Sequence, residues 1–150
     1  MERPKFNVRV YGILINNHQE VLLSDEEEHG KQFIKFPGGG LEFGEGLING
    51  LKREFIEECD LSIEILKHFY TTDFFIESAF GGGQLISIYY LVKPLQEINF
   101  KISKNEYDFE GQTSSSKQCF RFVPLEVLQN ESVTFPVDQH VVKLLKSNYL

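Results

Sequence analysis

Three glutamates within residues 53–58 have the residue type and spacing of a metal site. Glu54, Glu57 and Glu58 stand at positions i, i+3 and i+4, so they share one face if the segment is helical. Like charges at this spacing repel each other by roughly a few tenths of a kcal/mol per pair. A hard divalent cation such as Mg²⁺ takes oxygen ligands and keeps waters for a substrate phosphate. Taken alone, the segment favours a solvated acidic helix face; the glycine loop, Arg53 and Glu45 at matching spacings turn the preference to a cation site.

A helix over residues 46–59 is the element that must position these carboxylates. Gly50 inside this helix costs roughly 1 kcal/mol relative to Ala, which favours close backbone packing at that position. Apolar residues recur along the segment and form the stripe that we expect to be buried, namely Leu47, Ile48, Leu51 and Phe55.

A run of Pro and Gly at residues 37–40 precedes the helix. We expect it to stop the short strand predicted over residues 32–36 and to form a loop. Glycine has no side chain, so the backbone of such a loop can approach a ligand closely, and its carbonyl groups can bind a hard cation.

Composition and charge exclude several classes of protein. The chain has 150 residues, 41% hydrophobic and 25% charged, which is ordinary for one globular domain spanning residues 1–150. The net charge of −7 argues against a protein that coats nucleic acid polymers. Cys59 and Cys119 lie far apart and fit neither a disulfide scaffold nor a zinc site, which suits a reducing cytosol. We expect no signal peptide and no membrane span, hence a cytoplasmic protein.

Strands and helices alternate along the rest of the chain. We expect Pro124 to open a short helix through Leu128 and Pro136 to open the final helix. Residues 25–31 read as a charged, solvated loop, and residues 103–117 as a polar, mobile loop. Further strands are expected at residues 7–15, 20–24, 62–76, 84–93 and 119–123. This order predicts an α/β fold, with a mixed β-sheet and helices on both of its faces.

Residues 39–61 resemble the signature box of the Nudix hydrolases, G-x5-E-x7-R-E-U-x-E-E-x-G-U, in which U is apolar. The resemblance implies the α/β/α sandwich of that family. Asp60 replaces the late Gly and is the only departure, which we expect to affect stability more than metal binding. The matching residues are Gly39, Glu45, Arg53, Glu54, Phe55, Glu57, Glu58 and Leu61.

The resemblance also implies roles for the residues of the box. The carbonyl of Gly38 and the carboxylates of Glu57 and Glu58 would bind Mg²⁺, with Mn²⁺ as a substitute. Glu54 would be a further metal ligand or the base that deprotonates water. Structural roles are implied for Glu45, Arg53 and Gly39. The ion pair between Glu45 and Arg53 would brace the loop and the helix.

Outside the box, the candidates are weaker. Many Nudix enzymes supply another carboxylate from a loop late in the chain, and Glu110 is our first choice for it, with Glu106 second. Either residue is equally interpreted as loop surface. Arg9 and Lys35 are candidate contacts for substrate phosphate, with exposed surface charge as the alternative.

The resemblance predicts a Mg²⁺-dependent pyrophosphohydrolase. Its substrate would be a nucleoside diphosphate linked to another moiety, such as an ADP-ribose-like compound, a sugar nucleotide or a nucleoside triphosphate. A homodimer is expected by analogy. Two alternatives remain: a non-catalytic module that senses nucleotides, and an isoprenoid diphosphate isomerase, for which neither cysteine has an evident role.

Overall fold

The computed structural model describes residues 5–79, 81 and 83–149. The backbone divides into two compact units. The first contains residues 1–13 and 38–98, and the second contains residues 14–37 and 99–150. No helix among the described residues has the length and apolar character needed to cross a membrane.

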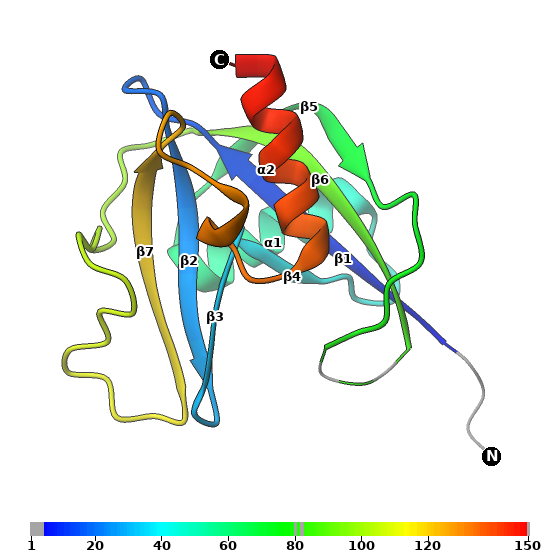
Figure 1. The fold of residues 1–150 in the computed structure, drawn as a ribbon, viewed down its shortest axis with the longest axis horizontal. Helices are drawn as coiled ribbons and strands as arrows, with labels where there is room; N and C mark the ends of the chain where they lie inside the picture. The colour runs from blue at the N-terminus through cyan, green and yellow to red at the C-terminus, as the bar shows by residue number, and fades with distance from the viewer. Residues whose placement is uncertain (1–4, 80, 82, 150) are drawn as a thin grey trace. The chain divides into compact units, whose positions relative to one another are not determined.

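The first unit is built on a four-stranded sheet with the order β4-β1-β6-β5. Its strands, labelled in Figure 1, are β1 (Phe6–Leu14), β4 (Gly38–Gly40), β5 (Ile63–Thr71) and β6 (Gln84–Pro94). The last two form the long antiparallel hairpin that the sequence predicts, with register shifts near residues 65–67 and 68–70. β5 ends at Thr71, where the sequence predicts a bend.

Strand β4 corrects one expectation, because the glycine run forms a strand and not a loop. It pairs antiparallel with β1 and sets Gly38 opposite Tyr11 and Gly39 opposite Val10. Gly38 has φ +144°, and a Cβ there would lie 2.1 Å from the carbonyl oxygen of Val10. Only glycine lets this backbone approach β1 so closely, because any side chain would separate the two strands.

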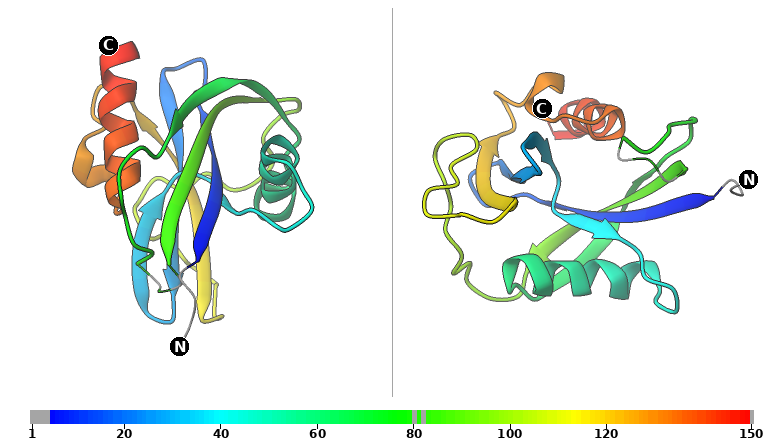
Figure 2. Two further views of the ribbon diagram at one scale, coloured as in Figure 1. Left: turned by 90° about the vertical axis from the view of Figure 1, so that its right-hand side faces the viewer. Right: turned by 90° about the horizontal axis from the view of Figure 1, so that it is seen from below.

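Helix α1 (Leu47–Cys59) runs along one face of this sheet (Figure 2). Phe55 anchors it, since a Cβ on Gly12 of β1 would lie 2.5 Å from the Phe55 ring. Gly50 is buried and faces Leu41, whose Cδ1 would lie 2.7 Å from an added Cβ, in line with the close packing expected there. Ile48 is 44% exposed, so its place in the buried stripe is wrong. The helix ends at Asp60 in the left-handed conformation (φ 49°), which binds the carbonyl of Ile56 through its N–H.

The second unit is built on a three-stranded antiparallel sheet with the order β3-β2-β7. Its strands are β2 (Glu20–Glu28), β3 (Lys31–Lys35) and β7 (Ser116–Pro124). The charged loop expected from residue 25 is wrong, because β2 continues through Glu28 between two partner strands. Asp25 and Glu26 are consequently buried, although local sequence reads as surface.

Two helical segments complete the second unit, namely η1 (Asn130–Ser132) and α2 (Pro136–Tyr149). The short helix expected from Pro124 to Leu128 is wrong: β7 includes Pro124 and a turn follows it. The Phe33 and Phe135 rings lie 5.4 Å apart and connect β3 to the start of α2.

Candidate active site

Helix α1 presents its glutamates beside strand β4. The carboxylate of Glu54 lies over the β4 backbone, because a Cβ on Gly39 would be 2.7 Å from its Oε1 atom. The Glu54 side chain is 12% exposed and that of Glu57 is 57% exposed. Glu58, one position further along the helix, is half-buried. Because Gly39 has no side chain, the Glu54 carboxylate can occupy the space beside its backbone.

Arg53 connects the helix to the segment that precedes it. Its Nε and Nη2 atoms donate to the Glu45 carboxylate at 2.9 and 2.7 Å, and Nη2 also donates to the Gly40 carbonyl at 3.0 Å. Its Nη1 atom lies 3.2 Å from Glu54 and 3.1 Å from Glu57. One guanidinium thus ties α1 to β4 and offsets the repulsion between the glutamates.

This network shifts the pKa values of both Glu45 and Arg53. The hydrogen bonds from Arg53, and next the one from the Glu42 N–H, lower the pKa of Glu45 to about 2. The Glu45 carboxylate in turn raises the pKa of Arg53. Both groups are therefore fully charged at neutral pH, which keeps the brace intact.

The chemical types of the available ligands suit a hard divalent cation. Three carboxylates and the carbonyls of a glycine strand are oxygen ligands of the type that Mg²⁺ takes. In residues 5–79, 81 and 83–149, no group of three or more acidic, His or Cys side chains is arranged to hold a metal ion. Arg53 contacts two of the three carboxylates, Glu54 and Glu57. The exposed Glu57 side chain has room to turn toward a cation.

The remaining candidates are divided between the two units. Gly38 is buried in β4, and Arg9 of β1 donates from Nε to the Tyr11 hydroxyl at 2.7 Å. Lys35 belongs to the second unit and is 5% exposed, with its Nζ atom 3.0 Å from Glu26. Lys35 is therefore not an exposed surface charge.

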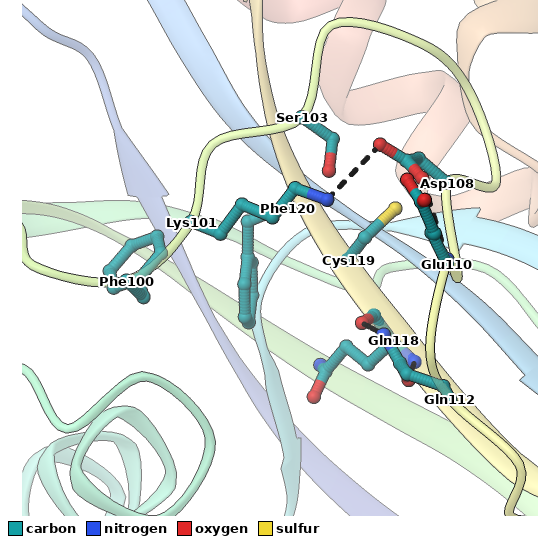
Figure 3. A pocket seen from close by; sticks show the side chains of 9 residues that line it. All are labelled: Phe100, Lys101, Ser103, Asp108, Glu110, Gln112, Gln118, Cys119 and Phe120. Carbon is teal, nitrogen blue, oxygen red and sulfur yellow. Dashed lines mark hydrogen bonds and ion pairs between the residues drawn. The ribbon is translucent and has the colours of Figure 1, made fainter.

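Glu106 and Glu110 are both exposed and lie in the irregular segment that precedes β7. Glu110 lines a cavity of about 190 Å³ beside β7, together with Asp108, Ser103 and Cys119 (Figure 3). Burial and the charge of Asp25 raise the pKa of the Cys119 thiol. These contacts place both predicted loop acids within the second unit.

Sequence reasoning missed a buried ion pair under this loop. Asp25 and Arg121 are 0% and 9% exposed, respectively, and join through two hydrogen bonds. No local signal separates Asp25 from the acidic run that follows it. Only the pairing of β2 with β7 shows that this aspartate is interior.

An α/β chain with a glutamate-bearing helix beside a glycine strand defines a recognisable class of protein. Residues 5–145 match the family model of the NUDIX domain. The chain therefore belongs to the Nudix family, and it is a hydrolase that acts on pyrophosphate bonds.

Solved structures agree on the fold. A NUDIX hydrolase from Nitrosomonas europaea is 16% identical with a TM-score of 0.70, and the match covers 96% of this chain and 90% of that one. A MutT protein from Methanosarcina mazei Go1 is 18% identical with a TM-score of 0.67, covering 100% and 99% of the two chains. A UDP-X diphosphatase is 14% identical with a TM-score of 0.61, covering 100% and 66%. The predicted Nudix-like α/β fold is thus confirmed, and no curated protein sequence matches the chain significantly.

Proposed function

We propose that this Nudix hydrolase is a Mg²⁺-dependent enzyme that cleaves the diphosphate of a nucleoside diphosphate linked to another moiety. The observation that carries the proposal is the carboxylate face of α1, with Glu54 seated over Gly39 and braced by Arg53. The names of similar structures, MutT and UDP-X diphosphatase, are consistent with a nucleotide substrate. We include in the proposal a cytoplasmic location and a homodimer.

Glu57, Glu58 and Glu54, with the carbonyl of Gly38, are the groups that would hold the cation. When bound there, a divalent ion neutralises the diphosphate and lowers the pKa of a water molecule. Mn²⁺ would substitute, because it also prefers oxygen ligands. Catalysis of this kind is mainly positioning and charge stabilisation, which explains the rigid brace around Glu54.

The chain's own groups handle the proton. A carboxylate oxygen of Glu54, or of a loop acid (Glu110 or Glu106), accepts the proton from the attacking water. The water oxygen forms a bond to one phosphorus, and the bridging P–O bond breaks with its electron pair moving to the leaving phosphate. The products are a nucleoside monophosphate and a phosphorylated partner, or pyrophosphate when the substrate is a triphosphate. Arg53 and Glu45 keep the helix and β4 in register during the reaction.

The test is a panel of nucleotides incubated with Mg²⁺, with phosphate release read after coupling to a phosphatase. Glu57→Gln and Glu58→Gln should each lower turnover by orders of magnitude. Glu64→Gln is the matched control, because Glu64 is an exposed acid of the same unit that pairs only with Lys93 in the described residues. Full activity in both helix variants would refute the site. No turnover of any nucleotide, with tight metal-independent binding, would favour the sensing module.

A measurement of Mg²⁺ binding distinguishes a loss of metal affinity from other effects of these substitutions. At about 100 times its dissociation constant, Mg²⁺ should stabilise the wild type by about 2.7 kcal/mol. The same addition should stabilise Glu57→Gln much less, and Glu64→Gln as much as the wild type. Equal stabilisation of all three proteins would place the cation elsewhere.

A further inference from the structure

The cavity beside β7 lies entirely within the second unit (Figure 3). Its lining residues belong either to β7 or to the segment of residues 100–112 that precedes this strand. The volume of about 190 Å³ is far larger than the space that one water molecule needs. It is smaller than the usual site of a drug-sized ligand. A cavity of this size suits a small organic molecule.

The buried side of the lining carries a hydroxyl without a partner. Ser103 is 5% exposed, and its Oγ atom makes no hydrogen bond in the described part of the chain. Figure 3 shows this oxygen directed toward the side of the cavity where Lys101 and Cys119 lie. Because an unsatisfied buried hydroxyl is costly, this atom indicates a ligand that supplies its partner.

The neighbouring thiol of Cys119 is a poor partner for this hydroxyl. Burial, followed by the charge of Asp25, raises the pKa of the thiol, and the Ser103 hydroxyl is among the weaker effects that lower it. The thiol is therefore neutral at physiological pH. A neutral thiol is only a weak hydrogen-bond acceptor, so Ser103 Oγ remains available to a molecule in the cavity.

The charged groups of the lining carry a net negative charge. The Lys101 Nζ atom lies 3.4 Å from Asp108 Oδ2, so these two charges offset each other. Glu110 is exposed, and its carboxylate has no cationic partner among the residues that the structure describes. The excess of carboxylate over ammonium groups favours a cationic ligand over an anion.

The amide groups of the lining add an acceptor. Gln112 donates from Nε2 to the Gln118 carbonyl at 2.7 Å and accepts the Gln118 N–H at 3.0 Å, so both ends of its amide are used. Gln118 donates from Nε2 to Ser24 Oγ at 2.8 Å, whereas its Oε1 atom accepts no hydrogen bond from a described residue. A primary ammonium has three N–H donors and no acceptor, which matches this surplus of acceptors.

The aromatic wall of the cavity suits the carbon chain of such a ligand. The Phe100 and Phe120 rings lie 4.9 Å apart, and aromatic faces attract ammonium groups as well as apolar chains. Hydrogen bonds hold the preceding segment in place. Ser103 donates its N–H to the Phe120 carbonyl at 2.7 Å, and the Tyr107 N–H donates to the buried Asp25 carboxylate at 2.8 Å. The cavity is therefore formed without a ligand, as small-molecule sites usually are.

We propose that this cavity binds a small organic cation with a primary ammonium group, which donates to Ser103 Oγ and to the Glu110 carboxylate. The short carbon chain of the ligand packs against Phe100 and Phe120. This inference goes beyond the proposed function, because none of its evidence comes from the glutamates of α1. Its test measures binding and not turnover, so the result does not depend on whether Glu110 also serves the proposed reaction.

The test is a nuclear magnetic resonance titration of the full chain with butylammonium chloride, observed at the backbone amides. The matched probes are 1-butanol, which is neutral, and sodium butyrate, which is anionic, at the same ionic strength. Butylammonium should bind with a Kd of about 1 mM, which is typical of so few non-hydrogen atoms, and should shift the amides of Ser103 and Phe120. The other two probes should bind at least about 10-fold more weakly, because they lack the charged donor.

Replacing Ser103 by Ala should have two separate effects. Ser103→Ala should weaken butylammonium binding by about 10-fold, since a hydrogen bond to a charged group is lost. Without a ligand it should melt at the same temperature as the wild type or higher, because it removes an unsatisfied hydroxyl. Glu110→Gln should weaken binding by a similar factor. The matched controls Ser147→Ala and Glu131→Gln replace exposed residues of the same unit and should bind like the wild type.

Several results would overturn the proposal. Equal affinity for 1-butanol would make the cavity an apolar site, and tighter binding of butyrate would assign recognition to Lys101. No saturable binding of butylammonium, or shifts confined to amides far from the cavity, would mean that the cavity holds only water. A Ser103→Ala protein that is unfolded or less stable than the wild type would show that the hydroxyl has a partner within the protein. Unchanged affinity in this variant would remove Ser103 from the site.

Discussion

Replacing Arg53 by Met tests whether the guanidinium is the brace between α1 and β4. Hydrogen bonds to charged groups contribute about 1.5–3 kcal/mol, and a bond to a neutral carbonyl about 1 kcal/mol. Arg53 makes the first kind with Glu45 and the second with Gly40, and its side chain is only 21% exposed. Met keeps the aliphatic packing but removes these hydrogen bonds, so that the Glu45 carboxylate retains only the bond from the Glu42 N–H among those that the described residues show. We therefore expect a loss of about 2–4 kcal/mol in the free energy of unfolding.

The assay is denaturation by urea at neutral pH and low salt, with the melting temperature as a second readout. For a chain of this size, a loss of about 2–4 kcal/mol lowers the melting temperature by about 5–15 °C. Lys52→Met is the matched control, because Lys52 is an exposed neighbour on the same helix. Its replacement should change stability by no more than about 0.5 kcal/mol.

The reasoning fails if Arg53→Met and Lys52→Met lose the same small amount. That result would mean that solvent screens the Arg53 contacts as it does those of ordinary surface pairs. A large loss of activity without a loss of stability would equally refute the brace, because it would assign Arg53 to the chemistry.

Three further predictions concern the same unit. The folded pKa of Glu45 is lowered from 4.5 to about 2, so its contribution to stability is complete above pH 4.5 and is lost as the pH falls toward 2. Acid titration of unfolding should show this slope in the wild type and lose it in Glu45→Gln. Asp60→Gly should raise stability by about 1 kcal/mol, since Asp60 is left-handed at φ 49° and glycine adopts that conformation without strain; a denaturation curve with an unchanged midpoint would contradict it. Gly12→Ala should lower the free energy of unfolding by about 1–3 kcal/mol, because the new methyl group would displace the Phe55 ring. An unaltered melting temperature in calorimetry would contradict this prediction.

The local pattern of the box carried most of the correct predictions. A helix with carboxylates at i, i+3 and i+4 and an apolar stripe was readable from residues 46–59, because helical periodicity is a local property. The left-handed conformation of Asp60 at the helix exit suits its residue type, because Asp adopts this conformation more readily than most residues. Ile48 was misplaced because the width of a buried stripe depends on what packs against it, and the buried residues of α1 are Gly50, Leu51, Phe55 and Cys59.

Strand partners decided what local reasoning missed. The glycine run became a strand because β1 lies beside it and supplies its hydrogen bonds. The acidic run became interior because β3 and β7 flank β2, and Lys35 and Arg121 then provide the opposite charges. Burying a carboxylate alone is costly, but a cationic side chain on a distant strand offsets that cost by pairing with it.

Local residue types and spacing predict which helix carries the glutamates, and the resemblance of the box implies the family and the bracing role of Arg53. These features depend on residues that lie close together in the sequence, so a local pattern is enough to predict them. Only the tertiary structure decided that Asp25 lies inside the second unit and holds Tyr107, because its partners are 96 and 82 residues away along the chain. Contacts at such separations follow from strand pairing, which no local pattern in one sequence specifies.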